Sequence, residues 1–217
     1  MNTSKRSKAI NYICKIAIMG ALAGIVMLLK FPILPTAPFL EFDFSNVIVL
    51  ISGFALGPFA AFLVASIRLA IDCMGGSATG YVGEFSAWLL CMTYSVPASI
   101  LYKYKKGFKW AMVAVAISLV LSNLMGIVSN WFIMFPLFGI PAEAIPNMIV
   151  TAVIPFNLIK FSIISVCVLL LYKPLSPVLK HNFQAKKKTV TKNQMVLEDG
   201  KADQVNNLEI NKEEQKD

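Results

Sequence analysis

The sequence predicts an all-α integral membrane protein with six transmembrane helices and both termini in the cytoplasm, and three observations support this prediction. Hydrophobic residues make up 57% of the 217 residues and charged residues only 15%, a balance too apolar for a water-soluble domain of this size. The apolar residues gather in runs long enough to cross a bilayer. The basic residues gather between and beyond these runs, where they mark cytoplasmic ends.

Five apolar runs are visible, and a full crossing needs about 20 residues at about 1.5 Å per residue. The runs lie near residues 12–30, 45–71, 81–102, 109–138 and 147–172. Clusters of lysine and arginine stand before the first run, between the third and fourth, and after the last. Because cytoplasmic loops carry the excess of basic residues, all three clusters are predicted to lie inside. The basic start also resembles a signal peptide, but the long apolar run after it favours a retained first helix.

The run at 45–71 must begin and end on the outer side, because the connections on either side of it are acidic. Gly57-Pro58 divides this run, and glycine followed by proline ends one helix and begins the next. Each half has about 13 residues and would be only about 20 Å long, so the hairpin should be buried against its neighbours. The predicted helices are therefore about 12–31, 45–57, 58–72, 81–103, 109–138 and 147–173, with the second and third short and joined at Gly57-Pro58.

Two segments outside these helices are predicted to differ in character. Residues 31–44 contain three prolines and are rich in phenylalanine, so they cannot form a regular helix and are a candidate outer lid. Beyond residue 178 the composition turns to Lys, Gln, Asn, Glu and Asp, which is typical of a disordered cytoplasmic tail. The predicted domains are a six-helix membrane domain over 1–178, with the lid at about 31–44, and a tail over 179–217.

Composition excludes several classes of site. The single histidine, His181, falls in the tail, and the four cysteines lack C-x-x-C spacing, so neither a zinc site nor a Ser-His triad is expected. No G-x-x-x-x-G-K-[ST] motif occurs, so the sequence offers no P-loop for ATP, and active transport would need an ion gradient or another subunit. The net charge of +8 reports membrane topology rather than nucleic-acid binding.

Ionisable and amide side chains within the predicted spans are binding-site candidates, because in lipid they are costly and face protein or a cavity. Glu84 and Asn130 fall in the outer halves of two helices, and Asn157 and Lys160 share one face of the last helix at i and i+3. Two amides beside a lysine and a carboxylate suit the polar edge of a heterocycle. A structural ion pair between Lys160 and Glu84 is the plainer alternative. The aromatic walls of such a site would come from Trp88, Trp131 and Phe132.

Basic side chains are too few in this region for a phosphate site. Arg68 is expected to pair with Asp72 one helical turn later rather than to meet a ligand. Lys160 then remains as the one basic group of the cavity, whereas phosphate is best bound by several charge-assisted hydrogen bonds. A neutral, polar and partly aromatic ligand fits better.

The first helix carries two neighbouring stripes of small residues. Ala17 and Ala21 form one, and Gly20 and Gly24 form the other. Small residues spaced in this way let another helix approach closely. Docking of a partner and packing within the chain both remain open as explanations, since small residues are common in membrane helices.

Five motifs in order resemble the substrate-binding S-components of energy-coupling-factor (ECF) vitamin transporters, and within them the riboflavin-specific subunit. The motifs are PFLEFDFSNV at 38–47, GFALGP at 53–58, GYVGEF at 80–85, NWFIMFPLFG at 130–139 and PFNLIK at 155–160. Each is weak alone, but five in order over about residues 12–175, on six helices with a Gly-Pro fold-back, are fairly specific. One departure is Glu41 in the lid, where lysine or a residue tolerant of a polar ligand is expected.

The resemblance implies a subunit of the bacterial cytoplasmic membrane that binds riboflavin as its transported ligand, with no cofactor and no ATPase site of its own. Its partners would be a membrane coupling subunit and two cytoplasmic ABC-type ATPases. Ala17 and Ala21 would contact the coupling subunit. The substrate contacts implied by the motifs are Glu84, Asn130, Asn157 and Lys160, with backbone and apolar contacts from Gly83, Phe39 and Leu40.

Three alternatives remain beside this interpretation. An S-component for another vitamin, such as folate, thiamine or biotin, would share the fold. An intramembrane enzyme with Glu84 as acid or base is disfavoured, because the spans hold neither paired carboxylates nor histidine. A structural membrane protein would use the first helix for assembly and bind no small molecule.

Overall fold

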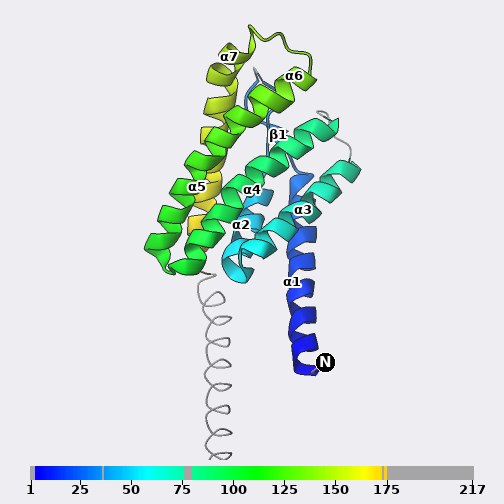
Figure 1. Cartoon of the computed structure of the whole chain (residues 1–217), viewed down its shortest axis with the longest axis vertical. Coiled ribbons are helices and arrows are strands. Elements are labelled where there is room, and N and C mark those ends of the chain that lie inside the picture. The colour runs from blue at the N-terminus through cyan, green and yellow to red at the C-terminus, as the bar shows by residue number, and fades with distance from the viewer. Residues whose placement is uncertain (1–2, 36, 76–79, 173, 175–217) are drawn as a thin grey trace, which may run out of the picture. The chain divides into compact units, whose positions relative to one another are not determined.

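The computed structural model describes residues 3–35, 37–75, 80–172 and 174, and within them it is a bundle of α-helices with one small strand pair (Figure 1). The predicted tail at 179–217 lies outside the described residues. The helices and strands, in chain order, are α1 (Thr3–Met27), β1 (Phe31–Pro32), β2 (Glu41–Phe42), α2 (Ser45–Leu56), α3 (Pro58–Gly75), α4 (Gly80–Tyr104), α5 (Phe108–Ser129), η1 (Asn130–Met134), α6 (Phe135–Leu137), α7 (Ile145–Met148) and η2 (Ile149–Val153).

Five helices in the described part of the chain are long and apolar enough to cross a membrane. Two of them are composite, because α5 continues through η1 and α6 as Phe108–Leu137, and α7 continues through η2 as Ile145–Tyr172, called the last helix below. The helix α2 is apolar but shorter. The chain is therefore a multi-pass membrane protein, and the predicted helix positions agree with the structure to within a few residues, apart from the start of α1.

The prediction that the third helix is short was wrong. The helix α3 has 18 residues, about 27 Å of helical rise. The sequence suggested an end at Asp72, because an acidic residue is typical of an outer connection. Asp72 is instead buried and paired with Lys30, so the helix continues past it to Gly75.

The turn between α2 and α3 forms at the predicted Gly57-Pro58 pair. Gly57 has a φ of 105°, a conformation that strains any residue with a Cβ. Its N–H still donates to the carbonyl of Gly53 at 2.9 Å and closes the last turn of α2. Pro58 takes the first position of α3, where the missing N–H of proline has no cost.

The lid, residues 31–44, contains no helix in its described residues, as its prolines predict. Its two ends pair as the antiparallel strands β1 and β2, with Phe31 opposite Phe42 and Pro32 opposite Glu41. The rings of Phe31 and Phe42 lie 5.6 Å apart, and Phe44 meets Phe42 edge-on at 4.8 Å. These contacts fold the lid into a hairpin that returns toward the start of α2.

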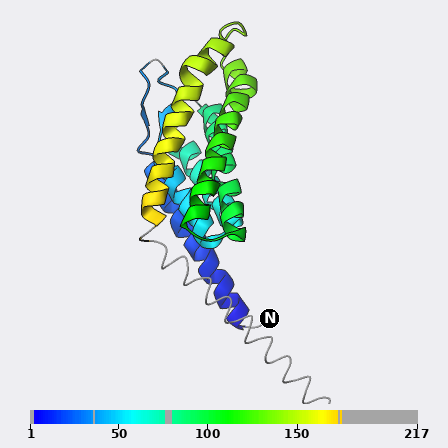
Figure 2. The ribbon, with the colours of Figure 1, turned by 90° about the vertical axis from the view of Figure 1, so that its left-hand side faces the viewer.

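Two π-helical turns lie at the same end of the bundle. In η1 the N–H of Phe135 donates to the carbonyl of Asn130, and in η2 the N–H of Ile154 donates to that of Ile149. Such wider turns are rare and occur often at functional sites, because they rotate the side chains that follow. The two helices that contain them run side by side in both views (Figures 1 and 2).

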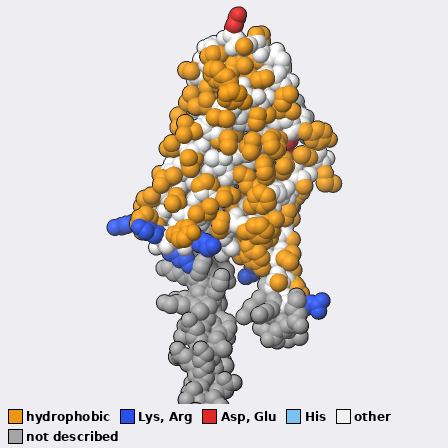
Figure 3. Space-filling model, viewed as in Figure 1, with side chains coloured by type: hydrophobic (Ala, Val, Ile, Leu, Met, Phe, Trp, Pro, Cys, Tyr) orange, Lys and Arg blue, Asp and Glu red, His pale blue; other side chains and the backbone are white. Residues whose placement is uncertain are grey.

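The surface of the bundle is largely apolar along its length (Figure 3). Lysine and arginine side chains gather at one end on this face. Lys103, Lys105 and Lys109 are exposed where α4 passes into α5. An apolar belt that ends in basic residues is the pattern expected of a bundle surrounded by lipid.

Candidate ligand-binding site

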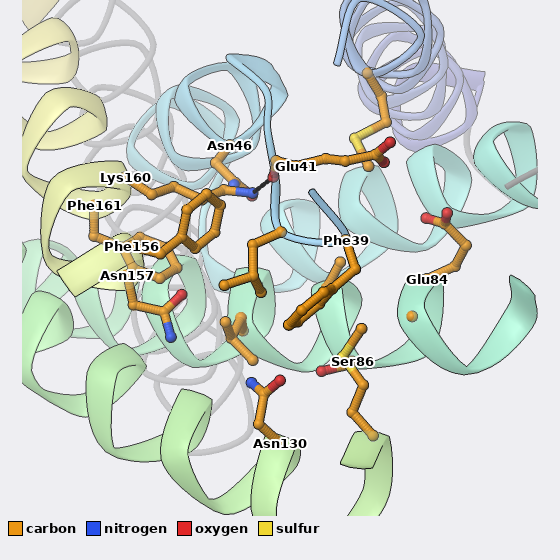
Figure 4. A pocket seen from close by; sticks show the side chains of 16 residues that line it. Phe39, Glu41, Asn46, Glu84, Ser86, Asn130, Phe156, Asn157, Lys160 and Phe161 are labelled. Atoms are coloured by element: carbon orange, nitrogen blue, oxygen red, sulfur yellow. Dashed lines mark hydrogen bonds between the residues drawn. The ribbon is translucent and has the colours of Figure 1, made fainter. Parts of the chain in front are cut away.

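The structure places all seven residues predicted to contact substrate around one pocket (Figure 4). The pocket lies among the lid, α4, the π turn η1 and the last helix. Residues from four of the five sequence motifs therefore meet at one place. They are Phe39 and Leu40 of the lid, Gly83 and Glu84 of α4, Asn130 of η1, and Asn157 and Lys160 of the last helix.

The pocket is nearly filled by the lid. Its free space is about 60 Å³, whereas pockets for drug-sized ligands hold roughly 300 to 1,000 Å³. Leu40 is buried, and the ring of Phe39 packs edge-on against Phe135 at 6.1 Å. Figure 4 shows Phe39 in the centre of the pocket. A ligand of vitamin size therefore fits only after these lid side chains move.

Two amide groups in the pocket have atoms without a hydrogen-bond partner. Asn130 donates through Nδ2 to the carbonyl of Gly126 at 2.8 Å, and its Oδ1 has no partner in the described part of the chain. Asn157 is buried, and its Nδ2 has no partner among the described residues. A buried polar atom without a partner costs free energy, so such atoms point to something that completes them. Among the described residues, this pocket therefore holds one unpaired acceptor and one unpaired donor.

Lys160 and Glu84 have separate partners, so the structure does not show the ion pair that was the plainer alternative. Its Nζ lies 3.0 Å from Oδ2 of Asp43 and donates to the carbonyl of Glu41, also at 3.0 Å. Both partners belong to the lid. The chain separation between Lys160 and Asp43 is 117 residues, which no pattern along the sequence reports.

Arg68 also has other partners than the predicted Asp72. Its Nη1 donates to Oδ1 of Asn46 at 2.8 Å, and its Nη2 lies 3.8 Å from the carboxylate of Asp43. Asn46 lines the pocket and was missed by the sequence analysis. The lid therefore places Asp43 between two cations, Lys160 and Arg68.

Asp43 remains ionised in this position. Burial alone would raise the pKa of its carboxyl, but the charges of Lys160 and Arg68 outweigh burial and hold the pKa below its usual range. Ser45 adds hydrogen bonds to the same carboxylate from its N–H and its hydroxyl. Lys160 is thus neutralised within the protein and does not offer a free positive charge to an anionic ligand.

Lys30, just beyond the end of α1, is the second residue that the sequence analysis missed. Its Nζ contacts three carboxylates: Glu84 at 3.0 Å, Asp72 at 3.1 Å and Glu41 at 3.2 Å. This one cation connects α1, the lid, α3 and α4. Glu41, the departure from the expected lid sequence, has its partner here, and Glu84 faces the pocket already paired.

The aromatic walls differ from those predicted. Trp131 and Phe132 are exposed. Trp88 is half-buried and packs with Phe85 at 5.7 Å and with Phe62 of α3 at 6.2 Å. The aromatic residues that line the pocket are instead Phe39, Phe156 and Phe161.

The two small-residue stripes of α1 have different surroundings. Gly20 and Gly24 are buried against α3, where a Cβ on Gly20 would lie 2.8 Å from Ile67. Ala17 and Ala21 are exposed. Packing within the chain therefore accounts for the glycine stripe and leaves the alanine stripe open on the surface.

Comparison with known proteins shows which family this fold and pocket represent. Residues 11–172 match the family model of the substrate-specific component of ECF transporters. The chain belongs to this family of transporter components. The fold of the S-component also matches a solved structure described as the S component of a bacterial ECF transporter, with a TM-score of 0.70 and 30% identity over 79% of this chain and 99% of the other.

Curated relatives of this S-component match it over most of their own length. The riboflavin transporter RibU of Staphylococcus aureus (strain TCH60) is 31% identical over 171 residues, which cover 76% of this chain and 90% of the relative. The riboflavin transporter FmnP of Bacillus subtilis (strain 168) is 25% identical over 174 residues, which cover 75% of this chain and 90% of the relative.

Proposed function

We propose that this S-component binds riboflavin at the pocket under the lid and delivers it for uptake across the bacterial cytoplasmic membrane. The observation that supports it most is the pair of unpartnered amide atoms, Asn130 Oδ1 and Asn157 Nδ2. The pyrimidine edge of the isoalloxazine ring presents an imide N–H between two carbonyl groups. Asn130 Oδ1 accepts from the imide N–H, and Asn157 Nδ2 donates to a neighbouring carbonyl. The relatives named as riboflavin transporters support riboflavin as the ligand.

The charge of the pocket also suits a neutral ring system. Lys160 and Arg68 surround Asp43, and Lys30 is held by three carboxylates. These side chains satisfy one another, so the site selects by hydrogen bonding and shape rather than by net charge. Phe156 and Phe161 line the pocket and supply apolar surface for the faces of the ring.

Transport needs partners. The sequence contains no P-loop, so the energy for uptake is supplied by two cytoplasmic ABC-type ATPases through a membrane coupling subunit. The exposed stripe at Ala17 and Ala21 is the surface on which the coupling subunit docks, because small side chains permit close helix contact.

Titration with riboflavin tests the proposed ligand. Protein purified in detergent from cells grown in ordinary medium is expected to show a flavin absorption spectrum, and the stripped protein should quench riboflavin fluorescence at about one ligand per chain. A colourless protein that leaves riboflavin fluorescence unchanged would contradict the proposal. Folate, thiamine and biotin would then be titrated in turn.

We further propose that the bundle crosses the membrane six times, with both termini in the cytoplasm, the α2–α3 turn inside and the lid outside. Cysteine labelling tests this topology in a variant whose four native cysteines are replaced. Phe59 is exposed beside the turn and Glu143 is exposed between α6 and α7. Phe59→Cys should react with a membrane-impermeant maleimide only after cells are opened, and Glu143→Cys should react in intact cells. Labelling of Phe59→Cys in intact cells would rule out this topology.

A further inference from the structure

We propose that Gly126 is a positioning residue for ligand recognition, because it orients the two amides that face the pocket. The inference rests on the proposed function. Gly126 is buried near the end of α5, just before the π turn η1, and lies behind the residues that line the pocket. Both Asn130 and Asn157 contact it, although they come from different helices.

The carbonyl of Gly126 fixes the orientation of Asn130. It accepts the side-chain Nδ2 of Asn130 at 2.8 Å and also the backbone N–H of the same residue. A carbonyl accepts only from a donor, so the nitrogen of the amide must turn toward Gly126 and the oxygen must turn away from it. This orientation makes Asn130 an acceptor toward the pocket.

The missing side chain of Gly126 makes room for Asn157. A Cβ at this position would lie less than 3.0 Å from Nδ2 of Asn157, whereas the next neighbour, Leu90, would be at an ordinary 3.6 Å. The space that a methyl group would fill is therefore taken by the amide of Asn157 alone. Figure 4 shows the Asn157 and Asn130 side chains at the same end of the pocket.

Together these contacts hold both amides in place. The nitrogen of each lies against Gly126, hydrogen-bonded to its carbonyl in Asn130 and set in the space of its missing side chain in Asn157. A single glycine holds both groups, one through its carbonyl and the other through its lack of a side chain. Alanine at this position would keep the first contact and displace the second.

The variant Gly126→Ala tests ligand recognition separately from folding. The atom displaced is the end of a flexible side chain, and alanine favours a helix more than glycine does. We expect the ligand-free variant to melt at the same temperature as the wild type or higher, and to bind riboflavin at least tenfold more weakly. If Gly126 had only a structural role, the substitution would lower the melting temperature and the riboflavin affinity together.

A double-mutant cycle with Asn157→Ala gives the decisive readout. If Gly126→Ala acts by displacing the Asn157 amide, the double variant should bind riboflavin as weakly as Asn157→Ala alone, because nothing remains to be displaced. Gly20→Ala is the matched control, since its methyl group would press on Ile67, away from the pocket. It should lower the melting temperature and leave the affinity of the folded protein unchanged.

The outcomes distinguish the inference from the function on which it rests. Wild-type protein that binds no riboflavin overturns both. If the wild type binds riboflavin and Gly126→Ala binds it with the same affinity, only the positioning role is overturned. Fully multiplicative losses in the double variant also overturn it, because the two substitutions would then act independently.

Discussion

Lys160→Met is expected to weaken riboflavin binding at least tenfold, equivalent to about 1.4 kcal/mol. Methionine has a similar length but lacks the ammonium group, so it loses the donor that faces the pocket. It also loses the hydrogen bond to the carbonyl of Glu41 and the ion pair with Asp43, both at 3.0 Å. The ligand contact and the closure of the lid over it should therefore fail together. Fluorescence titration of the purified variant measures the affinity, and stopped-flow mixing measures the dissociation rate.

The matched control is Lys109→Met. Lys109 is exposed at the basic end of the bundle, where α5 begins, so the same chemical change there should leave riboflavin affinity unaltered. Melting curves of both variants establish that the binding measured is that of folded protein. Unchanged affinity in Lys160→Met, with a normal melting temperature, removes Lys160 from the site.

Lys160→Met also weakens the closed lid, so the expected loss of riboflavin affinity is larger than that from one hydrogen bond. Asp43 is buried, and without Lys160 its remaining cation is Arg68 at 3.8 Å. A buried carboxylate whose nearest cation is this far away is costly even with the hydrogen bonds from Ser45. Opening the lid and moving Asp43 into water therefore lowers the free energy of the variant. Faster dissociation should therefore account for most of the affinity change, with little effect on association.

The sequence predicted the helices well because their signals are local. Apolar runs of sufficient length, a Gly-Pro pair at 57–58 and a proline-rich lid each specify the structure of their own segment. The candidate site could also be predicted from the sequence, since polar residues such as Asn157 are costly in membrane spans and are usually functional there. All seven predicted contact residues consequently lie around one pocket, and their contacts with ligand remain to be tested.

The features that the sequence analysis missed depend on long-range contacts. Lys30 and Asp43 lie in or beside the lid, and both have partners that are distant in sequence, such as Asp72 at 42 residues from Lys30 and Lys160 at 117 residues from Asp43. The lid has no hydrophobic period from which its folding can be derived. Trp131 is exposed and lies within the π turn η1, for which a single sequence gives no signal.

Ala21→Leu is expected to abolish riboflavin uptake and leave riboflavin binding intact. Ala21 is exposed on α1, and the proposed coupling subunit would meet this stripe at a short helix-to-helix distance that leucine does not permit. Uptake of labelled riboflavin is measured in cells that express the S-component with its coupling subunit and ATPases. Binding is measured on the same variant after purification in detergent.

Ala116→Leu controls for added bulk on a lipid-facing helix. Ala116 is exposed on α5, so this variant makes the same change away from the stripe and should transport normally. Normal uptake by Ala21→Leu would show that the stripe is no docking surface, and loss of binding as well as uptake would indicate misfolding. Misfolding is not the expected result, because the neighbouring Gly20 and Gly24 already make the contacts that attach α1 to α3. The same helix thus holds its own bundle by its glycines and leaves its alanines free for a partner.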